Sequence, residues 1–221
     1  MYGHTLIAAD LLGGVMANIM IDLFSGLGGA SEAFVDAPEW SVIRIDNNPE
    51  VVEATKGTWQ LDLNRPGEVI QVIDAHLYDL HVEKLVVWAS PPCTDFSTKN
   101  PNRGQNDFSL DLARSAMVII DHLHAQYGVH TWIIENVRGA VNHFEPLLGP
   151  YRQRIGPFFL WGSFVPIACI DSDTHRHKKP FNRTNSRTHL RSNIHAKVPY
   201  ALSHSLLLSV ERQTSLTGWV E

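Results

Sequence analysis

Three features of the sequence predict an α/β fold with a doubly wound, mostly parallel sheet and a short basic arm near the C-terminus. Short apolar runs alternate with stretches of helical periodicity, which is typical of parallel strands joined by helices. A glycine-rich turn follows the first apolar run, and positive charge gathers in the last third of the chain. In doubly wound sheets ligands bind beyond the carboxyl ends of the strands, so functional residues are expected in those loops.

Four runs are predicted to be buried parallel strands, because they are short, apolar on both faces and end at turn signals. They are Ile19–Phe24, Ser41–Asp46, Lys84–Ala89 and Thr131–Asn136. The segments with helical periodicity are Gly29–Val35, Pro49–Lys56 and Leu110–Tyr127. The third is the clearest helix, since Leu112, Ala116 and Ile119 recur on one side and Gly128 follows its end.

The pattern changes in the last third of the chain. Ile155–Trp161 is apolar but interrupted by a Gly-Pro pair, which predicts an irregular or edge strand. Residues 171–197 have little apolar content and no periodicity, and are predicted to be a loop or an arm that folds on binding. Pro199–Arg212 returns to a helical pattern.

The chain is therefore expected to have four parts. Residues 1–18 are a possible N-terminal extension, and Met16 offers an alternative start. Residues 19–170 form the main domain, residues 171–197 the basic arm, and residues 198–221 a C-terminal helix that returns to the main domain.

The composition is that of an ordinary globular protein, with 221 residues of which 44% are hydrophobic and 19% charged. No apolar run is long enough to span a bilayer, and the first residues lack the basic leader of a signal peptide. The two cysteines, Cys93 and Cys169, do not lie in a CxxC motif, so neither a disulfide framework nor a metal site is expected. A reducing cytoplasm is the expected location.

The net charge of −5 conceals an asymmetry along the chain. Residues 1–150 contain 8 Lys and Arg against 19 Asp and Glu, whereas residues 151–221 contain 10 against 4. Between Thr174 and Lys197 there are seven Lys or Arg, four His and no acid. A phosphate backbone would be attracted to this segment, although a basic loop that contacts only solvent explains the charge equally well.

The first candidate functional motif is DLFSGLGGASEAF, Asp22–Phe34. A strand ends, glycines permit a tight turn against a ligand, and a helix begins. Asp46 follows at the end of the next predicted strand, where a carboxylate can hold ribose hydroxyls. A dinucleotide-binding fingerprint has nearly the same layout, and a glycine turn can also be purely structural.

The second motif is WASPPCTDFST, Trp88–Thr98, which directly follows a buried strand. A free cysteine is usually a small core residue. The prolines and polar residues around Cys93 instead indicate a loop at the carboxyl edge of the sheet, where the side chain could act as a thiolate nucleophile.

The third motif, WIIENVRG, sets Glu135 at the end of another strand, where a buried carboxylate is costly without a task or a partner. A capping or salt-bridged glutamate would also explain it. The fourth motif, RQRIGPFFLWG, carries Arg152 and Arg154 two residues apart, so in an extended segment both would point to the same face.

Taken together and in this order, the motifs resemble those of the DNA cytosine-5 methyltransferase family. The family's cofactor loop matches Phe24–Gly29, and its proline–cysteine loop matches Pro92–Cys93. Its ENV tripeptide matches Glu135–Val137, its arginine pair Arg152–Arg154 and its C-terminal helix Val198–Val210. The match covers nearly the whole chain after residue 19. The resemblance implies the Rossmann-like fold of class I S-adenosylmethionine-dependent methyltransferases, with residues 19–170 as the catalytic domain.

The resemblance also implies a reaction, the methylation of carbon 5 of a cytosine that is flipped out of duplex DNA. Cys93 would attack carbon 6, and carbon 5 would then take the methyl group of S-adenosylmethionine. Glu135 would hold or protonate N3, and Arg154, with Arg152 nearby, would support the O2 side of the ring. The enzyme is expected to be a monomer.

The resemblance assigns cofactor and DNA contacts as well. Phe24 would pack on the adenine, Asp46 would hold the ribose and Asp62 would approach the adenine amine. The other expected cofactor contacts are Ser25, Gly26, Gly28, Gly29, Asn47, Leu63 and Pro91. The expected DNA contacts are Thr94, Asp95 and Ser97 in the cysteine loop and Arg176, Lys178, Lys179, Arg183, Arg187 and Arg191 in the basic arm.

The sequence departs from the family pattern in several places. Thr94 stands where many relatives have Gln, Asp46 where Glu is commoner, and VPYALS lacks the usual Gly-Asn. Only residues 155–197 separate the arginine pair from the last motif, where relatives have a much larger target-recognition region. Short or relaxed sequence specificity is therefore expected, and such compact members suggest a phage or prophage origin.

Three alternatives remain at this point. An NAD-dependent oxidoreductase would explain the glycine loop and Asp46, but not Cys93 together with Glu135. A non-catalytic DNA-binding remnant would explain the short recognition region. The same chemistry on RNA fits the motifs equally well, and a partner protein could supply part of the recognition.

Overall fold

The computed structural model describes residues 15–96, 108–129, 131–168 and 190–217. They form a seven-stranded sheet with the strand order β3-β2-β1-β4-β5-β7-β6. The first five strands of this order are parallel, whereas β7 runs antiparallel to both β5 and β6. The doubly wound, mostly parallel sheet predicted from the sequence is confirmed.

The bounds of the elements agree with most of the predicted ones. The strands are β1 (Val15–Leu23), β2 (Trp40–Asp46), β3 (Thr58–Gln60), β4 (Leu80–Ala89), β5 (Thr131–Asn136), β6 (Gln153–Ile155) and β7 (Phe158–Ser163). The helices are α1 (Glu32–Val35), α2 (Pro49–Ala54), α3 (Pro66–Leu77), α4 (Phe108–Tyr127), α5 (Val141–Leu148), α7 (Arg191–Ala196) and α8 (Tyr200–Thr217), and a 3-10 helix, η1, spans Arg138–Ala140. Elements β3, β6, α3, η1, α5 and α7 are additions to the predicted set.

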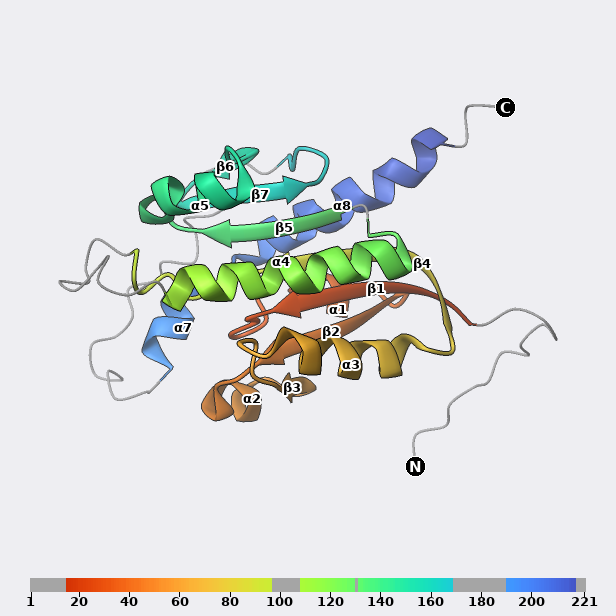
Figure 1. Ribbon diagram of the computed structural model, residues 1–221. Coiled ribbons are helices and arrows are strands. Elements are labelled where there is room, and N and C mark those ends of the chain that lie inside the picture. Colours follow the sequence, from red (N-terminus) through yellow and green to blue (C-terminus); the bar gives the residue numbers. More distant parts are fainter. Residues whose placement is uncertain (1–14, 97–107, 130, 169–189, 218–221) are drawn as a thin grey trace.

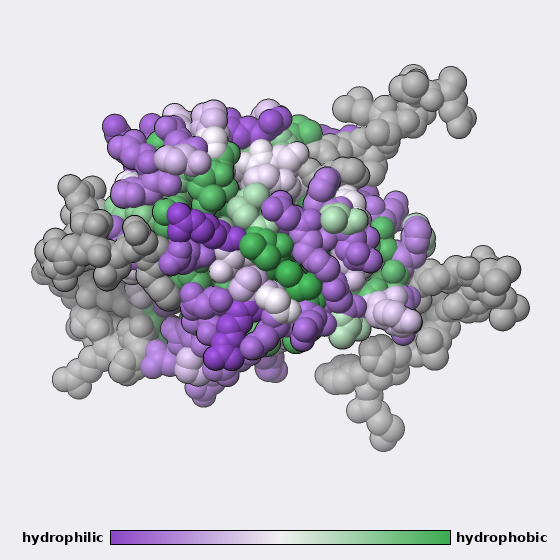
Figure 2. Space-filling view, in the orientation of Figure 1, coloured by the Kyte–Doolittle hydropathy of each residue, from purple (hydrophilic) through white to green (hydrophobic). Residues whose placement is uncertain are grey.

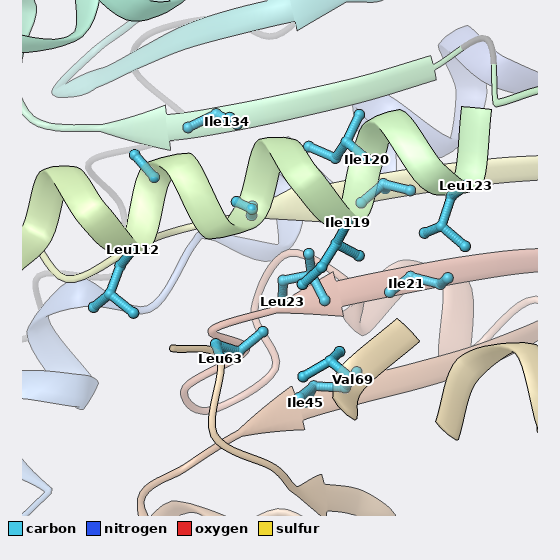
Figure 3. Packing of buried hydrophobic residues seen from close by; sticks show 14 of the residues in the cluster. Ile21, Leu23, Ile45, Leu63, Val69, Leu112, Ile119, Ile120, Leu123 and Ile134 are labelled. Atoms are coloured by element: carbon cyan, nitrogen blue, oxygen red, sulfur yellow. The ribbon is translucent and has the colours of Figure 1, made fainter. Parts of the chain in front are cut away.

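Helices cover both faces of the sheet, and a hydrophobic core lies on each side. Figure 1 shows α3 and α4 in front of the strands and α8 behind them. Figure 3 shows Leu112, Ile119 and Leu123 of α4 pointing toward the strands, where Ile21 and Leu23 of β1 lie. These side chains are almost fully buried, so the apolar stripe predicted for this helix is its contact with the sheet.

The outer face of this helical layer contacts solvent. Figure 2 shows it as mostly hydrophilic, with only small groups of hydrophobic residues. Among the described helices, none is long and apolar enough to cross a membrane.

The prediction for Ile155–Trp161 is wrong. Instead of one irregular or edge strand, β6 and β7 form a hairpin, and β7 lies inside the sheet between β5 and β6. The Gly-Pro pair occupies the turn of this hairpin, with Gly156 at a φ of 56°. Pro157 therefore removes no hydrogen bond from either strand, which is why the strands tolerate it.

Several predicted boundaries also differ from the structure. β4 begins at Leu80 rather than Lys84, and α8 ends at Thr217 rather than Arg212. β1 begins at Val15 rather than Ile19, so the last residues of the expected extension belong to the sheet. The first helix starts only at Glu32, because the glycine turn continues up to Ser31.

Part of the expected basic arm is helical. α7 occupies Arg191–Ala196, within the segment predicted to lack regular structure. The expected C-terminal helix is present as α8 and packs on α1, where Ser203 Oγ donates to the Ala30 carbonyl at 2.6 Å and accepts from the Ala33 amide at 3.0 Å.

Candidate active site

The predicted functional loops meet at the carboxyl edge of the parallel strands, on the left in Figure 1. β1 ends before the glycine loop, β2 at Asp46, β4 before the cysteine loop and β5 at Asn136. Because parallel strands deliver these ends to one edge, segments far apart in sequence become neighbours there.

The glycine loop forms the predicted tight turn. Phe24, Gly26 and Gly28 all have positive φ angles, of 56°, 50° and 69°. For Phe24 this backbone region is unfavourable, so the surrounding contacts must hold it. The Ser25 amide donates to the Ile45 carbonyl at 3.0 Å, which ties the loop to β2.

Asp46 supports the loop and retains capacity for a ligand. One carboxylate oxygen accepts from the Gly26 amide at 2.9 Å and the other from the Asn48 amide at 2.9 Å. Each carboxylate oxygen can accept a further hydrogen bond, so a hydroxyl-bearing ligand could still bind here. Beside it, the buried hydroxyl of Ser25 has no hydrogen-bond partner among the described residues, and a polar ligand group would satisfy it.

The other predicted cofactor residues lie around this loop with different exposure. Phe24 is half-buried, Leu63 and Pro91 are buried, and Asn47 is exposed. Asp62 is also exposed and accepts from the Asn64 amide at 3.0 Å and from its side chain at 2.9 Å. These hydrogen bonds lower the pKa of Asp62, so it stays a carboxylate that can accept from a ligand amine.

The segment between α7 and α8 packs directly on the glycine loop. A side chain at Gly29 would collide with the backbone carbonyl of Val198, so only glycine permits this approach. The Lys197 ammonium forms an ion pair with Glu32 at 2.9 Å. The last residue of the expected arm and the start of the expected C-terminal segment therefore lie against the glycine loop.

A buried polar network that the motif analysis missed lies under the loop. The Ser31 hydroxyl donates to Asp22 Oδ2 at 2.7 Å and accepts from Arg44 Nε at 2.8 Å. Burial raises the pKa of Asp22 to about 7, against the opposing effects of Ser31 and Arg44. Near neutral pH this carboxyl therefore changes charge directly beneath the glycine loop.

The raised pKa of Asp22 predicts a pH-dependent stability that Asp22→Asn should remove. The folded chain binds this proton up to pH about 7, whereas an unfolded Asp loses it near pH 3.9, so the free energy of unfolding falls as pH rises between these values. Asp22→Asn has no charge to bury. We expect its melting temperature to exceed that of the wild type by a few degrees at pH 8 and to vary less with pH.

Thermal unfolding between pH 5 and pH 8 measures this difference. Asp111→Asn is the matched control, because Asp111 lies on the exposed surface of α4 in an ion pair with Arg114. Parallel pH profiles for Asp22→Asn and the wild type would contradict the assigned role of Asp22.

The cysteine loop is fixed to the end of β5 at three points. Ser90 Oγ donates to Glu135 Oε2 at 2.8 Å, and Asn136 Nδ2 donates to the Pro91 carbonyl at 2.9 Å. The third point is Gly139, where any side chain would collide with the Phe96 backbone. The structure therefore brings the motifs of Cys93 and Glu135 together, as their sequence positions predict.

Burial favours the protonated forms of both Glu135 and Cys93. Glu135 is 8% exposed, and burial raises its pKa to about 7 against the opposing hydrogen bond of Ser90. Burial, and then the charge of Glu135, raise the pKa of the Cys93 thiol above its ordinary value. The raised pKa favours the protonated thiol near neutral pH.

The prediction that both arginines point to one face is wrong. The Arg152 guanidinium lies 5.6 Å from the ring centre of Phe164, which belongs to the core on the α8 side of the sheet. The Arg154 guanidinium lies 5.5 Å from the ring centre of Phe159, which belongs to the core on the α4 side of the sheet. Arg152 precedes β6, so the alternation of a strand does not extend to it.

Arg154 instead lines a cavity beside the end of β5. The cavity has a volume of about 410 Å³ and is lined by Arg138, Val141, Asn142, Tyr151, Arg154 and Phe159. Arg154 Nε donates to the Gly156 carbonyl at 2.9 Å, which helps to hold the guanidinium there. The register pairs Arg154 with Phe159 and Phe159 with Asn136, whereas Glu135 pairs with Leu160, so the Glu135 side chain points to the opposite face of the sheet from Phe159.

The predicted DNA contacts are only partly described. Thr94 is exposed and Asp95 half-buried in the turn after Cys93, and Arg191 is the first residue of α7. The remaining ones, Ser97, Arg176, Lys178, Lys179, Arg183 and Arg187, lie outside the described residues. Within the described ranges, no three His, Cys, Asp or Glu side chains are grouped so as to hold a metal ion.

Comparison with known proteins adds a family match to this geometry. A family model described as C-5 cytosine-specific DNA methylase matches residues 19–147. Among solved structures the chain is similar to a methyltransferase from Entamoeba histolytica, with 13% identity and a TM-score of 0.37, over 69% of this chain and 54% of that one. The similarity thus spans about half the length of the amoeba protein. No protein with a curated description matches the chain.

Proposed function

Because the chain belongs to the C-5 cytosine-specific DNA methylase family, we propose that it transfers a methyl group from S-adenosylmethionine to carbon 5 of cytosine in DNA. The observation that supports this most strongly is the hydrogen bond between Ser90 of the cysteine loop and Glu135 of β5. It sets a protonatable, buried carboxyl beside a cysteine, which is the pair of groups that this chemistry requires.

The proposed reaction begins at Cys93. Carbon 5 of cytosine is a weak nucleophile, so attack of the Cys93 sulfur on carbon 6 is needed to form an S–C6 bond and move the electron pair of the ring double bond to carbon 5. Negative charge then develops toward N3. A Glu135 carboxyl that carries a proton donates it, or a hydrogen bond, to N3 and so stabilises this state.

The second half of the reaction restores the aromatic ring. S-adenosylmethionine, when bound, supplies the methyl group as an electrophile. Once carbon 5 carries this group, a base removes the proton of carbon 5, and N3 returns any proton it has taken to Glu135. The double bond between carbons 5 and 6 then re-forms as the S–C6 bond breaks, which releases the Cys93 sulfur as a thiolate. Arg154 and Arg152 are proposed to act on the substrate from the two sides of the sheet edge.

The glycine loop is proposed to hold the cofactor. The unpartnered hydroxyl of Ser25 and the spare acceptor positions of Asp46 fit a ligand with polar and hydroxyl groups. Leu63 and Phe24 offer apolar surface for an adenine, and Asp62 is an acceptor for its amine. The proposed contacts also include Gly26, Gly28, Gly29, Asn47 and Pro91.

A methylation assay tests the proposed function directly. Purified protein is incubated with S-adenosylmethionine and either duplex DNA or RNA, and 5-methylcytosine is mapped by bisulfite sequencing. We expect 5-methylcytosine in DNA at short or relaxed sequence contexts. Product on RNA alone would replace the proposed substrate, whereas stabilisation by NAD but not by S-adenosylhomocysteine in a thermal-shift assay would overturn the proposed cofactor.

The basic arm is proposed to hold DNA phosphates, and this predicts a change in salt dependence. Replacing both Lys178 and Lys179 by Gln removes two positive charges and therefore the release of about two counterions on binding. We expect weaker binding to every DNA sequence alike, with the slope of log affinity against log salt reduced by about two. Fluorescence anisotropy over a range of salt concentrations measures both quantities.

The control for this experiment removes two charges elsewhere. The combined Lys56→Gln and Arg114→Gln variant loses the same two positive charges as the double lysine variant. Both residues are exposed and lie outside the basic arm. Loss of affinity at a single sequence context would show that the two lysines read bases. An unchanged slope would mean that the arm does not contact DNA.

A further inference from the structure

A chain of hydrogen bonds leads from the core to the Glu135 carboxyl. The indole Nε1 of Trp88 donates to Ser90 Oγ at 2.7 Å, and Ser90 Oγ donates to Glu135 Oε2 at 2.8 Å. Trp88 is 1% exposed and lies in β4 among the core residues on the α8 side. Neither Trp88 nor Ser90 has a role among the site residues expected from the motifs.

The direction of this chain follows from the donors and acceptors in it. An indole N–H can only donate, so the Ser90 oxygen is its acceptor. The ionised Glu135 carboxylate can only accept, so the Ser90 hydroxyl donates its proton to Oε2. If Ser90 keeps this direction when the carboxyl is protonated, Oε2 is the carbonyl oxygen and the proton lies on Oε1.

We propose that Trp88 and Ser90 are positioning residues that keep Oε2 of Glu135 as a hydrogen-bond acceptor and so assign the proton of its carboxyl to Oε1. Among the described residues no hydrogen bond to Oε1 is formed, which leaves that oxygen available to a substrate. The inference rests on the proposed function, in which Glu135 acts on N3 of cytosine.

The consequence is a carboxyl with one defined donor oxygen. Without the hydrogen bonds from Trp88 to Ser90 and from Ser90 to Glu135, the carboxyl could carry its proton on either oxygen. Half of these arrangements would present an acceptor, and not a donor, to N3 of the cytosine. With Oε2 engaged, the proton faces the ring nitrogen that gains electrons during attack by Cys93. The hydrogen bond from Ser90 also lowers the pKa of Glu135, which burial raises to about 7.

Single-residue variants separate this role from packing. Ser90→Ala removes the donor to Oε2, and Trp88→Phe removes only the indole N–H that orients Ser90. Ser90→Thr keeps the hydroxyl and serves as the conservative rescue. Trp161→Phe is the matched control, because Trp161 is 0% exposed and its indole N–H has no hydrogen-bond partner among the described residues.

The pH profile of turnover should distinguish these variants. Activity that depends on the charge of Glu135 changes as pH passes the pKa of this carboxyl, so loss of the Ser90 hydrogen bond should move this limb of the pH profile to higher pH. We expect Ser90→Ala to lower kcat by about tenfold or more at little change in KM, with a smaller effect in the same direction for Trp88→Phe. Ser90→Thr should retain the wild-type limb, and Trp161→Phe should leave it unmoved.

A spectroscopic readout keeps the inference testable even if the chain proves inactive. Infrared difference spectra below pH 6 contain the C=O stretch of the protonated Glu135 carboxyl, which Glu135→Gln identifies by deleting it. If Oε2 is the carbonyl oxygen that accepts from Ser90, Ser90→Ala shifts this band to higher frequency. If neither the infrared band nor the limb of the pH profile set by Glu135 differs between Ser90→Ala and Trp161→Phe, the positioning role of Trp88 and Ser90 is overturned. Absence of methylation in the wild type together with a shifted band would overturn only the proposed function.

Discussion

Cys93→Ala is expected to reduce methyl transfer to below detection, because no other group in the site can form the bond to carbon 6 that activates carbon 5. The change removes only a sulfur atom from a half-buried loop position, so the fold should survive. The glycine loop and Asp46, which are proposed to hold the cofactor, lie on other strands. Affinity for S-adenosylhomocysteine, measured by calorimetry, should therefore be nearly unchanged.

Covalent trapping identifies the nucleophile independently of turnover. With 5-fluorocytosine in the DNA, the substituent on carbon 5 cannot leave as a proton, so the S–C6 bond should persist in the wild type. A gel shift that resists denaturation, followed by peptide mapping, locates the bond. Cys169→Ala is the matched control and should still be trapped. Trapping at Cys169, or activity in Cys93→Ala, would remove Cys93 from the proposed mechanism.

The elevated pKa of the Cys93 thiol adds a condition to this mechanism. Burial and the charge of Glu135 both disfavour the thiolate. When Glu135 carries a proton, its contribution disappears, so protonation of the carboxyl and formation of the thiolate favour each other.

The sheet could be predicted because its central strands are buried on both faces. Runs such as Lys84–Ala89 and Thr131–Asn136 have no polar alternation that would allow a helix or a surface strand to compete. The three-residue β3 gives too short a pattern to recognise. α3 did carry a signal, with a proline at its first residue and Val69, Ile73 and Leu77 spaced along one buried face.

The positions of the main site residues could be predicted, but their partners could not. Cys93 lies in the loop that follows one buried strand, and Glu135 lies at the end of another. Parallel pairing of the two strands alone brings such positions together. The bond between Ser90 and Glu135 joins residues 45 apart, and that between Ser203 and Ala33 joins residues 170 apart. Such contacts depend on how the loops pack, as does the burial that raises the pKa of Asp22 and Glu135.

Glu135→Gln is expected to lower turnover by a factor of about 10² or more, because the amide cannot supply a proton to N3 as the ring accepts electrons. The Gln carbonyl can still accept from Ser90, so the geometry at the end of β5 should persist. Cofactor affinity should not change. The wild-type rate should change with pH around about 7, the pKa of Glu135, while the residual rate of the variant lacks this change.

Stability provides the decisive comparison for this variant. Since burial raises the pKa of Glu135, ionisation opposes folding, and the free energy of unfolding falls as pH rises from about 4 to about 7. Glu135→Gln abolishes this loss and should melt at or above the wild-type temperature at pH 8. A catalytic carboxyl thus predicts a variant that is less active and no less stable. A variant that unfolds more readily, with unchanged activity in its folded fraction, would instead assign Glu135 a structural role in joining β5 to the cysteine loop.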